Sequence, residues 1–195
     1  MKPLFGVLAL LVNLLGYIPY VHDIVKGRVK PQRITWGIWA ALSSVVFANQ
    51  VTNGGGWSVY FFGSSALVTS LVFILSLRRG TGGSSRTDRM LLVAAIILFV
   101  YWLFSRDTRY TTLIAILIDA LGALPTILKA YNSPRSETYP QWVMAGVGGA
   151  LSLLAIAKTD YILYMYPLYI VLVNALIVSA KYYAERYTPA RDIPS

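Results

Sequence analysis

Long apolar runs, separated by short polar segments rich in lysine and arginine, make up most of the chain. A helix of about 20 apolar residues crosses a hydrocarbon core about 30 Å thick. One charge-free stretch of 44 residues accounts for two such helices, because Thr52 is followed by Asn53 and three glycines that favour a turn. We predict membrane-spanning helices at residues 3–21, 34–51, 57–77, 90–105, 111–131, 141–157 and 161–180.

The composition supports a membrane protein and excludes several other classes. Charged residues make up 13% of the 195 residues and hydrophobic residues 56%, which leaves too little charge to cover the surface of a soluble domain. The chain has no cysteine and one histidine, which excludes a disulfide framework, an iron–sulfur cluster and a histidine-rich metal centre. We therefore expect an all-α membrane protein of seven helices, without a metal or a cofactor.

The basic residues are unevenly shared between alternate connecting segments. Of the 17 lysines and arginines, 13 lie in or beside the segments that follow the odd-numbered helices, and four lie in the others. Lys and Arg accumulate on the cytoplasmic side of membrane proteins, so we predict the N-terminus outside and the C-terminus in the cytoplasm. The net charge of +9 then reflects topology and contact with anionic lipids, and no nucleic-acid partner is expected.

Two parts of the chain share a pattern at an offset of 106 to 109 residues. The matching polar, glycine and proline positions are Asn13 and Asp119, Gly16 and Gly122, and Pro19 and Pro125. Pro-Gln dipeptides follow in both parts, at 31–32 and 140–141. A repeat of three spanning helices ends on the opposite side of the membrane from where it begins. Two such repeats therefore have the same orientation only when one extra helix joins them. We therefore predict a repeat at 1–79, a linker with one helix at 80–110, and a second repeat with a short basic tail at 111–195.

These motifs resemble the SWEET, SemiSWEET and PQ-loop clan of seven-helix transporters. Gly122-x-x-Pro125-Thr126 resembles the Pro-Thr segment of SWEET helices, and Asn174 matches the substrate-facing asparagine of their last helix. The segment from Gly27 to Trp39 is similar to uncharacterised bacterial members, and this similarity implies a location in a bacterial plasma membrane. The Pro-Gln dipeptides begin helices here, whereas PQ-loop proteins carry theirs within the first and fifth helices. The resemblance implies a 3+1+3 carrier fold with parallel repeats but no particular substrate.

Asp119 is the first candidate for a functional residue, because it lies near the middle of the fifth predicted helix. An ionisable group at that depth costs roughly 3 kcal/mol or more and marks a solute or proton pathway by default. The resemblance adds that PQ-loop exporters couple protons through acidic residues of the second repeat. The alternative is a neutral, purely structural Asp119, held by hydrogen bonds to Asn13 or to a tyrosine.

Other polar and aromatic residues are candidates for a solute site at the same depth. Asn174 pairs with Ser65, and Tyr60 with Tyr169, at an offset of 109. An interhelical hydrogen bond is the alternative role for Asn174. The two tryptophans of the second helix are expected to differ, with Trp36 anchoring the helix at the membrane interface and Trp39 facing a pocket.

The matched prolines and glycines are candidates for a gate. Proline removes a backbone hydrogen bond and makes bending easy, so Pro19 and Pro125 could act as hinges near the cytoplasmic ends of their helices. Gly16 and Gly122, one turn earlier, would add freedom or allow close packing. Static kinks are the alternative.

Three functional classes follow, in order of preference. The first is a carrier of a small polar solute that works by alternating access between the repeats, with Asp119 as a possible proton carrier. The second is a seven-helix receptor or sensor that transports nothing. An enzyme ranks last, because no histidine lies at the depth of Ser65 and no HExxH motif or carboxylate pair is present. One chain already contains both repeats, so a homo-oligomer is optional.

Overall fold

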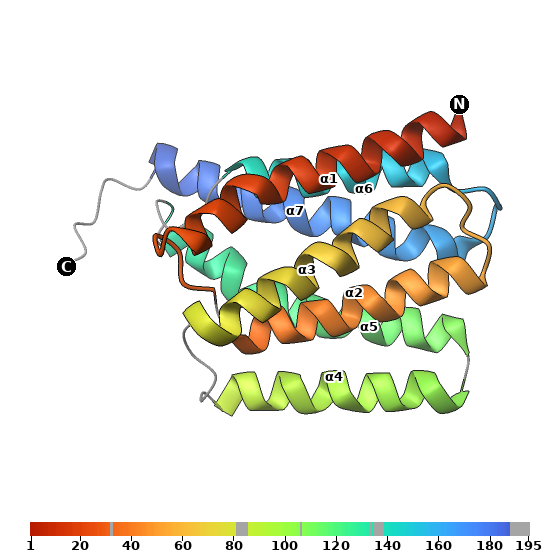
Figure 1. The fold of residues 1–195 in the computed structure, drawn as a ribbon, viewed down its shortest axis with the longest axis horizontal. Coiled ribbons are helices and arrows are strands. Elements are labelled where there is room, and N and C mark those ends of the chain that lie inside the picture. Colours follow the sequence, from red (N-terminus) through yellow and green to blue (C-terminus); the bar gives the residue numbers. More distant parts are fainter. Residues whose placement is uncertain (32, 81–85, 106, 133, 135–138, 188–195) are drawn as a thin grey trace.

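The computed structural model describes all residues except 32, 81–85, 106, 133, 135–138 and 188–195. The described residues form seven helices, one at each predicted apolar run (Figure 1). The helices are α1 (Lys2–Val25), α2 (Arg33–Thr52), α3 (Val59–Arg79), α4 (Arg86–Ser105), α5 (Thr108–Asn132), α6 (Tyr139–Ala155) and α7 (Tyr161–Tyr187).

Most helices extend beyond the apolar runs that predict them. The last one continues from residue 180 to Tyr187, and α1 continues from residue 21 to Val25. A helix satisfies its own backbone hydrogen bonds, so it can run past the hydrocarbon core into the polar interface. In contrast, α6 ends at Ala155, two residues early, because Ile156 pairs with Gly56 in an isolated antiparallel bridge.

Five helices in the described part of the chain are long and apolar enough to cross a membrane, namely α1, α2, α3, α5 and α7. The helix α6 has 17 residues, and α4 has a shorter apolar stretch, Leu92–Tyr101. Leucines and isoleucines are exposed around the outside, Leu67, Ile97 and Leu117 among them. These features identify a multi-pass integral membrane protein.

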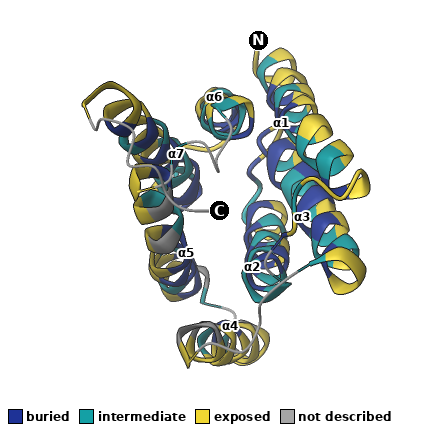
Figure 2. Ribbon diagram, turned by 90° about the vertical axis from the view of Figure 1, so that its left-hand side faces the viewer, coloured by how far each residue is buried: buried dark blue, intermediate teal, exposed yellow. Residues whose placement is uncertain are grey.

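The helices pack as two groups of three with α4 beside them. The third helix, α3, contacts both α1 and α2, and α7 contacts both α5 and α6. The two groups meet mainly where α1 packs on α6, and also where α2 meets α5. The remaining helix, α4, lies along α2 and α5 at one side of the bundle (Figures 1 and 2). Buried positions lie on the faces that the helices turn toward one another (Figure 2).

The connections α2–α3 and α6–α7 meet at the end of the bundle where α1 begins (Figure 1). Gly54 and Gly56 adopt φ values of 71° and 68°, a left-handed conformation that favours glycine. The turn lets the Gly55 carbonyl accept a hydrogen bond of 3.1 Å from the Ala157 amide. The Lys2 ammonium donates to the Ala157 carbonyl at 3.0 Å. We call this contact between residues 55–56 and 156–157 the loop seal.

A substitution at Gly6 tests the packing of α1 on the loop seal. A Cβ atom there would overlap the Trp57 carbonyl oxygen and lie 2.7 Å from the Trp57 Cβ, so α1 would have to move away. We expect Gly6→Ala to lower the free energy of unfolding by about 1–3 kcal/mol, a typical cost of overpacking. Thermal unfolding in detergent measures the change.

The matched control is Gly146→Ala, because its Cβ would lie at an ordinary 3.4 Å from the Asn174 Cβ. A Gly6→Ala protein as stable as Gly146→Ala would contradict this packing.

Candidate functional site

A cavity of about 90 Å³ lies inside the bundle, between the two groups of three helices. All helices except α4 contribute to its lining, and most of the polar side chains sit near the middle of their helices. The volume accommodates several water molecules or a small solute. The polar lining residues are Asn13, Tyr17, Ser43, Ser65, Thr69, Asp119, Gln141, Tyr166 and Asn174.

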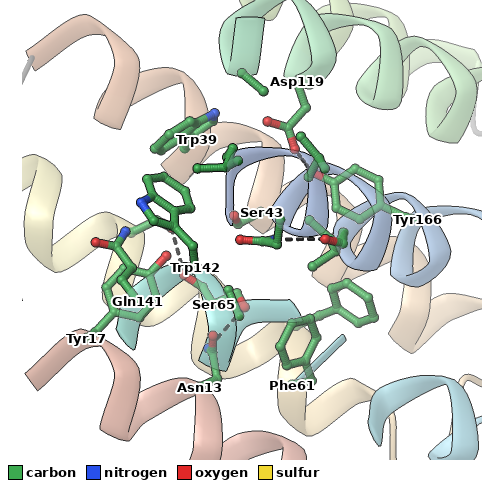
Figure 3. A pocket seen from close by; sticks show the side chains of 18 residues that line it. Asn13, Tyr17, Trp39, Ser43, Phe61, Ser65, Asp119, Gln141, Trp142 and Tyr166 are labelled. Carbon is green, nitrogen blue, oxygen red and sulfur yellow. Dashed lines mark hydrogen bonds between the residues drawn. The ribbon is translucent and has the colours of Figure 1, made fainter. Parts of the chain in front are cut away.

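Asp119 is the only carboxylate among the described residues that line the cavity. Its side chain, on α5, is buried at 8% exposure. The Tyr166 hydroxyl of α7 donates a hydrogen bond of 2.7 Å to its Oδ2 atom (Figure 3). The Trp39 indole of α2 also interacts with the carboxylate. Three helices therefore converge on one acidic group.

Asn13, the predicted repeat mate of Asp119, is almost fully buried at 2% exposure. Its Nδ2 atom donates to the Ser64 hydroxyl at 2.9 Å. The same atom donates to the Ser65 hydroxyl at 3.1 Å (Figure 3). These two bonds join α1 to α3 at the wall of the cavity. Asn13 and Asp119 line the same cavity, but the described hydrogen bonds of Asn13 go to serines.

Asn174 leaves one buried acceptor without a partner. Its Nδ2 atom donates to the Ile170 carbonyl at 2.8 Å, one turn earlier in α7. Its Oδ1 atom is buried and has no hydrogen-bond partner among the described residues. A buried polar atom without a partner costs about 1–3 kcal/mol. Because Asn174 lines the cavity, a water or a solute can supply the missing donor there.

Aromatic rings form one side of the cavity and continue toward the end of the bundle where α7 ends. Trp39 contacts Trp36 and Trp142 edge to face, with ring centroids 5.2 and 6.4 Å apart. Trp36 lies between Tyr17 and Tyr20 and is 4% exposed. The assignment of Trp36 to the membrane interface is therefore wrong, because the ring fills space between α1 and α2.

At the end near the loop seal, aromatic rings close the cavity. Phe61 and Phe62 are edge to face at 5.1 Å, and Phe62 contacts Tyr166 at 6.1 Å. Beyond these rings, the Gln50 amide donates to the Leu163 carbonyl at 3.1 Å and links α2 to α7. The Ser58 hydroxyl donates to the Gln50 Oε1 atom, also at 3.1 Å. This end is closed by two layers, one apolar and one hydrogen-bonded.

Five predicted solute-site residues line the cavity together: Asn13, Trp39, Ser65, Asp119 and Asn174. Tyr60 does not, because it lies near the start of α3 with 46% exposure and its ring stacks on Trp57 at 5.3 Å. Tyr169 lies next to the lining, 5.6 Å from the Tyr166 ring, and its buried hydroxyl has no hydrogen-bond partner among the described residues. The offset of 109 that paired the two tyrosines does not bring them to one site.

The predicted hinge residues lie at comparable places in α1 and α5. Gly16 allows a close approach of α6, since a Cβ there would lie 2.9 Å from the Met144 Cβ. Gly122 faces the Trp39 indole, where a Cβ would lie at an ordinary 3.7 Å. Pro19 sits on the exposed side of α1. Pro125 lies within α5, but its side chain falls outside the described residues.

Several lining residues escaped the sequence analysis although a simple rule finds them. Residues four apart share a helix face. Tyr17 follows Asn13 at that spacing, Ser43 follows Trp39, and Thr69 follows Ser65. Tyr166 precedes Asn174 by eight residues, which is the same rule applied twice. Gln141 belongs to the second Pro-Gln dipeptide, at the start of α6.

Comparison with known proteins adds no assignment to this site. No family model matches the chain, and no curated protein and no solved structure is significantly similar to it.

Replacing Tyr166 with phenylalanine tests its hydrogen bond to Asp119. The change removes a donor from a buried carboxylate, so we expect the free energy of unfolding to fall by about 1–3 kcal/mol. In an Asp119→Asn background the same change should cost less, since a neutral amide loses less than a carboxylate. Thermal unfolding of the four proteins in detergent gives this coupling.

Tyr164→Phe is the matched control, because Tyr164 is half-buried on the same helix and does not line the central cavity. Equal losses for Tyr166→Phe in the wild-type and Asp119→Asn backgrounds would show that Tyr166 does not specifically stabilise the carboxylate.

Proposed function

We propose that this protein is a carrier that moves a small polar solute through the central cavity by alternating access. The observation that carries the proposal is a mid-depth cavity with a buried carboxylate and a buried amide oxygen that lacks a partner. Such groups are costly in a membrane and are kept where a solute or ion passes. The cavity also lies between two groups of three helices, where parallel-repeat carriers hold their solute.

The proposed repeats are α1–α3 and α5–α7, with α4 as the linker. In each group the third helix contacts the other two, and the first and second helices lie on either side of it. This matching arrangement agrees with the offset of 106 residues that pairs Asn13 with Asp119. We include membership in the SWEET and PQ-loop clan in the proposal, on the motifs and on this helix arrangement.

The proposed orientation places the loop seal outside and the C-terminal end of α7 in the cytoplasm. Basic residues gather at the ends of α1, α3 and α7, whereas Lys2, Arg109 and Lys158 are the described ones near the loop seal. Retention of Lys and Arg on the cytoplasmic side favours this orientation.

Contacts at the two ends of the bundle support a cavity that opens toward the cytoplasm. Hydrogen bonds join the two repeats at the loop seal, from Ala157 to Gly55, and beside it, from Gln50 to Leu163. At the other end, the described hydrogen bonds of basic residues do not join the two repeats. Arg33 donates to the Ser76 carbonyl at 3.0 Å in the first repeat, and Lys181 donates to Glu185 at 2.6 Å in the second. Opening to the outside would require the loop seal to separate.

Asp119 is the proposed proton carrier. A carboxyl group in a low-dielectric site takes up and releases a proton when its surroundings change between water and protein. Alternating access would supply that change, because each state exposes the cavity to one side. The Tyr166 hydroxyl would stabilise the charged form through its hydrogen bond.

Uptake into proteoliposomes tests the carrier. The panel contains sugars, amino acids and nucleosides, each with and without a pH gradient, for the wild type, Asp119→Asn and the control Asp23→Asn. Asp23 lies in the last turn of α1, outside the cavity, and pairs with Arg28 at 3.5 Å. We expect uptake that the gradient drives and that only Asp119→Asn abolishes, because asparagine carries no proton.

Two other outcomes would change the proposal. Uptake that ignores the gradient and survives Asp119→Asn would identify a facilitator and reduce Asp119 to a structural role. No flux of any solute, together with a solute that raises the melting temperature, would favour the receptor instead.

A further inference from the structure

The lining of the cavity is complementary to a positive charge. It contains the Asp119 carboxylate and the partnerless Oδ1 atom of Asn174, both of which accept hydrogen bonds. Among the described lining residues, none is Lys, Arg or His. A buried carboxylate without a cation is costly, and the Tyr166 hydroxyl and the Trp39 indole offset this cost with neutral donors only. The missing partner is a cation that also donates hydrogen bonds.

The aromatic side of the cavity favours the same kind of solute. Trp39 and Trp142 both line it, with their rings at 80° to each other. Tyr17 and Tyr166 line it as well, from α1 and α7. Ring faces attract organic cations by about 0.5–2 kcal/mol, most strongly where water is excluded. A neutral sugar would leave the carboxylate uncompensated.

The groups that face Asp119, as far as the structure describes them, supply no positive charge. The helices that pack around it bring Tyr17 from α1, Trp39 from α2, and Tyr166 and Tyr169 from α7. From α4, the described side chains that pack toward the core are apolar, Ala95 and Leu98 among them. Lys181, a buried lysine of α7, is held by Glu185 and the Pro134 carbonyl and does not line the cavity. Because no described residue neutralises this carboxylate, a proton or a bound solute is left for that role.

We propose that the solute of this carrier is a small protonated amine. Its ammonium group binds the Asp119 carboxylate and donates to Asn174, and its alkyl part packs against Trp39 and Trp142. This inference rests on the proposed carrier and specifies its solute. One carboxylate cannot be neutralised by a proton and an ammonium group at once, so the two compete and the carrier exchanges them across the membrane.

Equilibrium binding to the purified full-length protein tests this inference without requiring transport. The probes are n-butylammonium and the neutral butan-1-ol of nearly the same size, measured by calorimetry and by tryptophan fluorescence. We expect butylammonium to bind at least about tenfold more tightly, as an ion pair and ring contacts in a desolvated site would give. Lowering the pH should weaken its binding to the wild type, although the amine itself stays protonated.

Substitutions test whether the preference for butylammonium over butan-1-ol depends on Asp119. Asp119→Asn should abolish the preference for the cation, and Asp23→Asn should keep it. If Asp119→Asn does not fold, two other measurements replace it, namely binding to Trp39→Leu and binding to the wild type at lower pH. Butylammonium binding should be weaker in both. Equal affinity for butylammonium and butan-1-ol, or binding of the amine that does not depend on pH or on Asp119, would overturn the inference.

Failure of this inference is distinguishable from failure of the carrier. Uptake of a neutral solute by a protein that does not bind butylammonium would contradict the proposed amine solute and would support the carrier function. Binding of butylammonium at Asp119 without flux in proteoliposomes would support the amine-binding site and contradict the carrier function.

Discussion

Lipid on the outside of this bundle forces its polar side chains to meet in the middle. The exterior exposes leucine and isoleucine, whereas Asn13, Asp119 and Asn174 are buried at mid-depth. In hydrocarbon these groups have no water to bind, so each must find a partner on another helix or face a cavity. Asn13 donates hydrogen bonds to Ser64 and Ser65, and Asp119 accepts one from Tyr166. Asn174 keeps an unsatisfied oxygen beside the cavity, which is the feature that a packed, purely structural core would avoid.

The seven helices and the importance of Asp119 could be predicted from the sequence, because both depend on the local pattern of apolar and charged residues. Apolar runs locate seven helices, and the cost of burying an ionisable group singles out Asp119. The partners could not be predicted, because they depend on which helices touch. Tyr166 lies 47 residues from Asp119 and meets it only after α5 packs on α7. Trp36 was misplaced for the same reason, since its environment is set by Tyr17 and Tyr20 of α1 and not by its depth.

The proposed mechanism uses one acidic group for two purposes. A carboxylate that binds either a proton or an ammonium group couples the two fluxes without any further charged residue. The two ends of the bundle then have to open in turn. Hydrogen bonds at and beside the loop seal join the repeats at one end. At the other end, the described bonds from Arg33 to Ser76 and from Lys181 to Pro134 do not join the repeats. In the proposed cycle, this arrangement corresponds to the state that we propose opens toward the cytoplasm.

Thiol accessibility of a single cysteine tests this account most directly, because the natural chain has none. Ser43 lines the cavity, whereas its neighbour Ser44 is exposed on the lipid-facing side of α2. A small, polar, membrane-impermeant thiol reagent applied from the cytoplasmic side should modify Ser43→Cys much faster than Ser44→Cys. The same reagent applied from the outside should react slowly with both. Equal rates for the two variants, or faster modification of Ser43→Cys from the outside, would contradict a central cavity that opens to the cytoplasm.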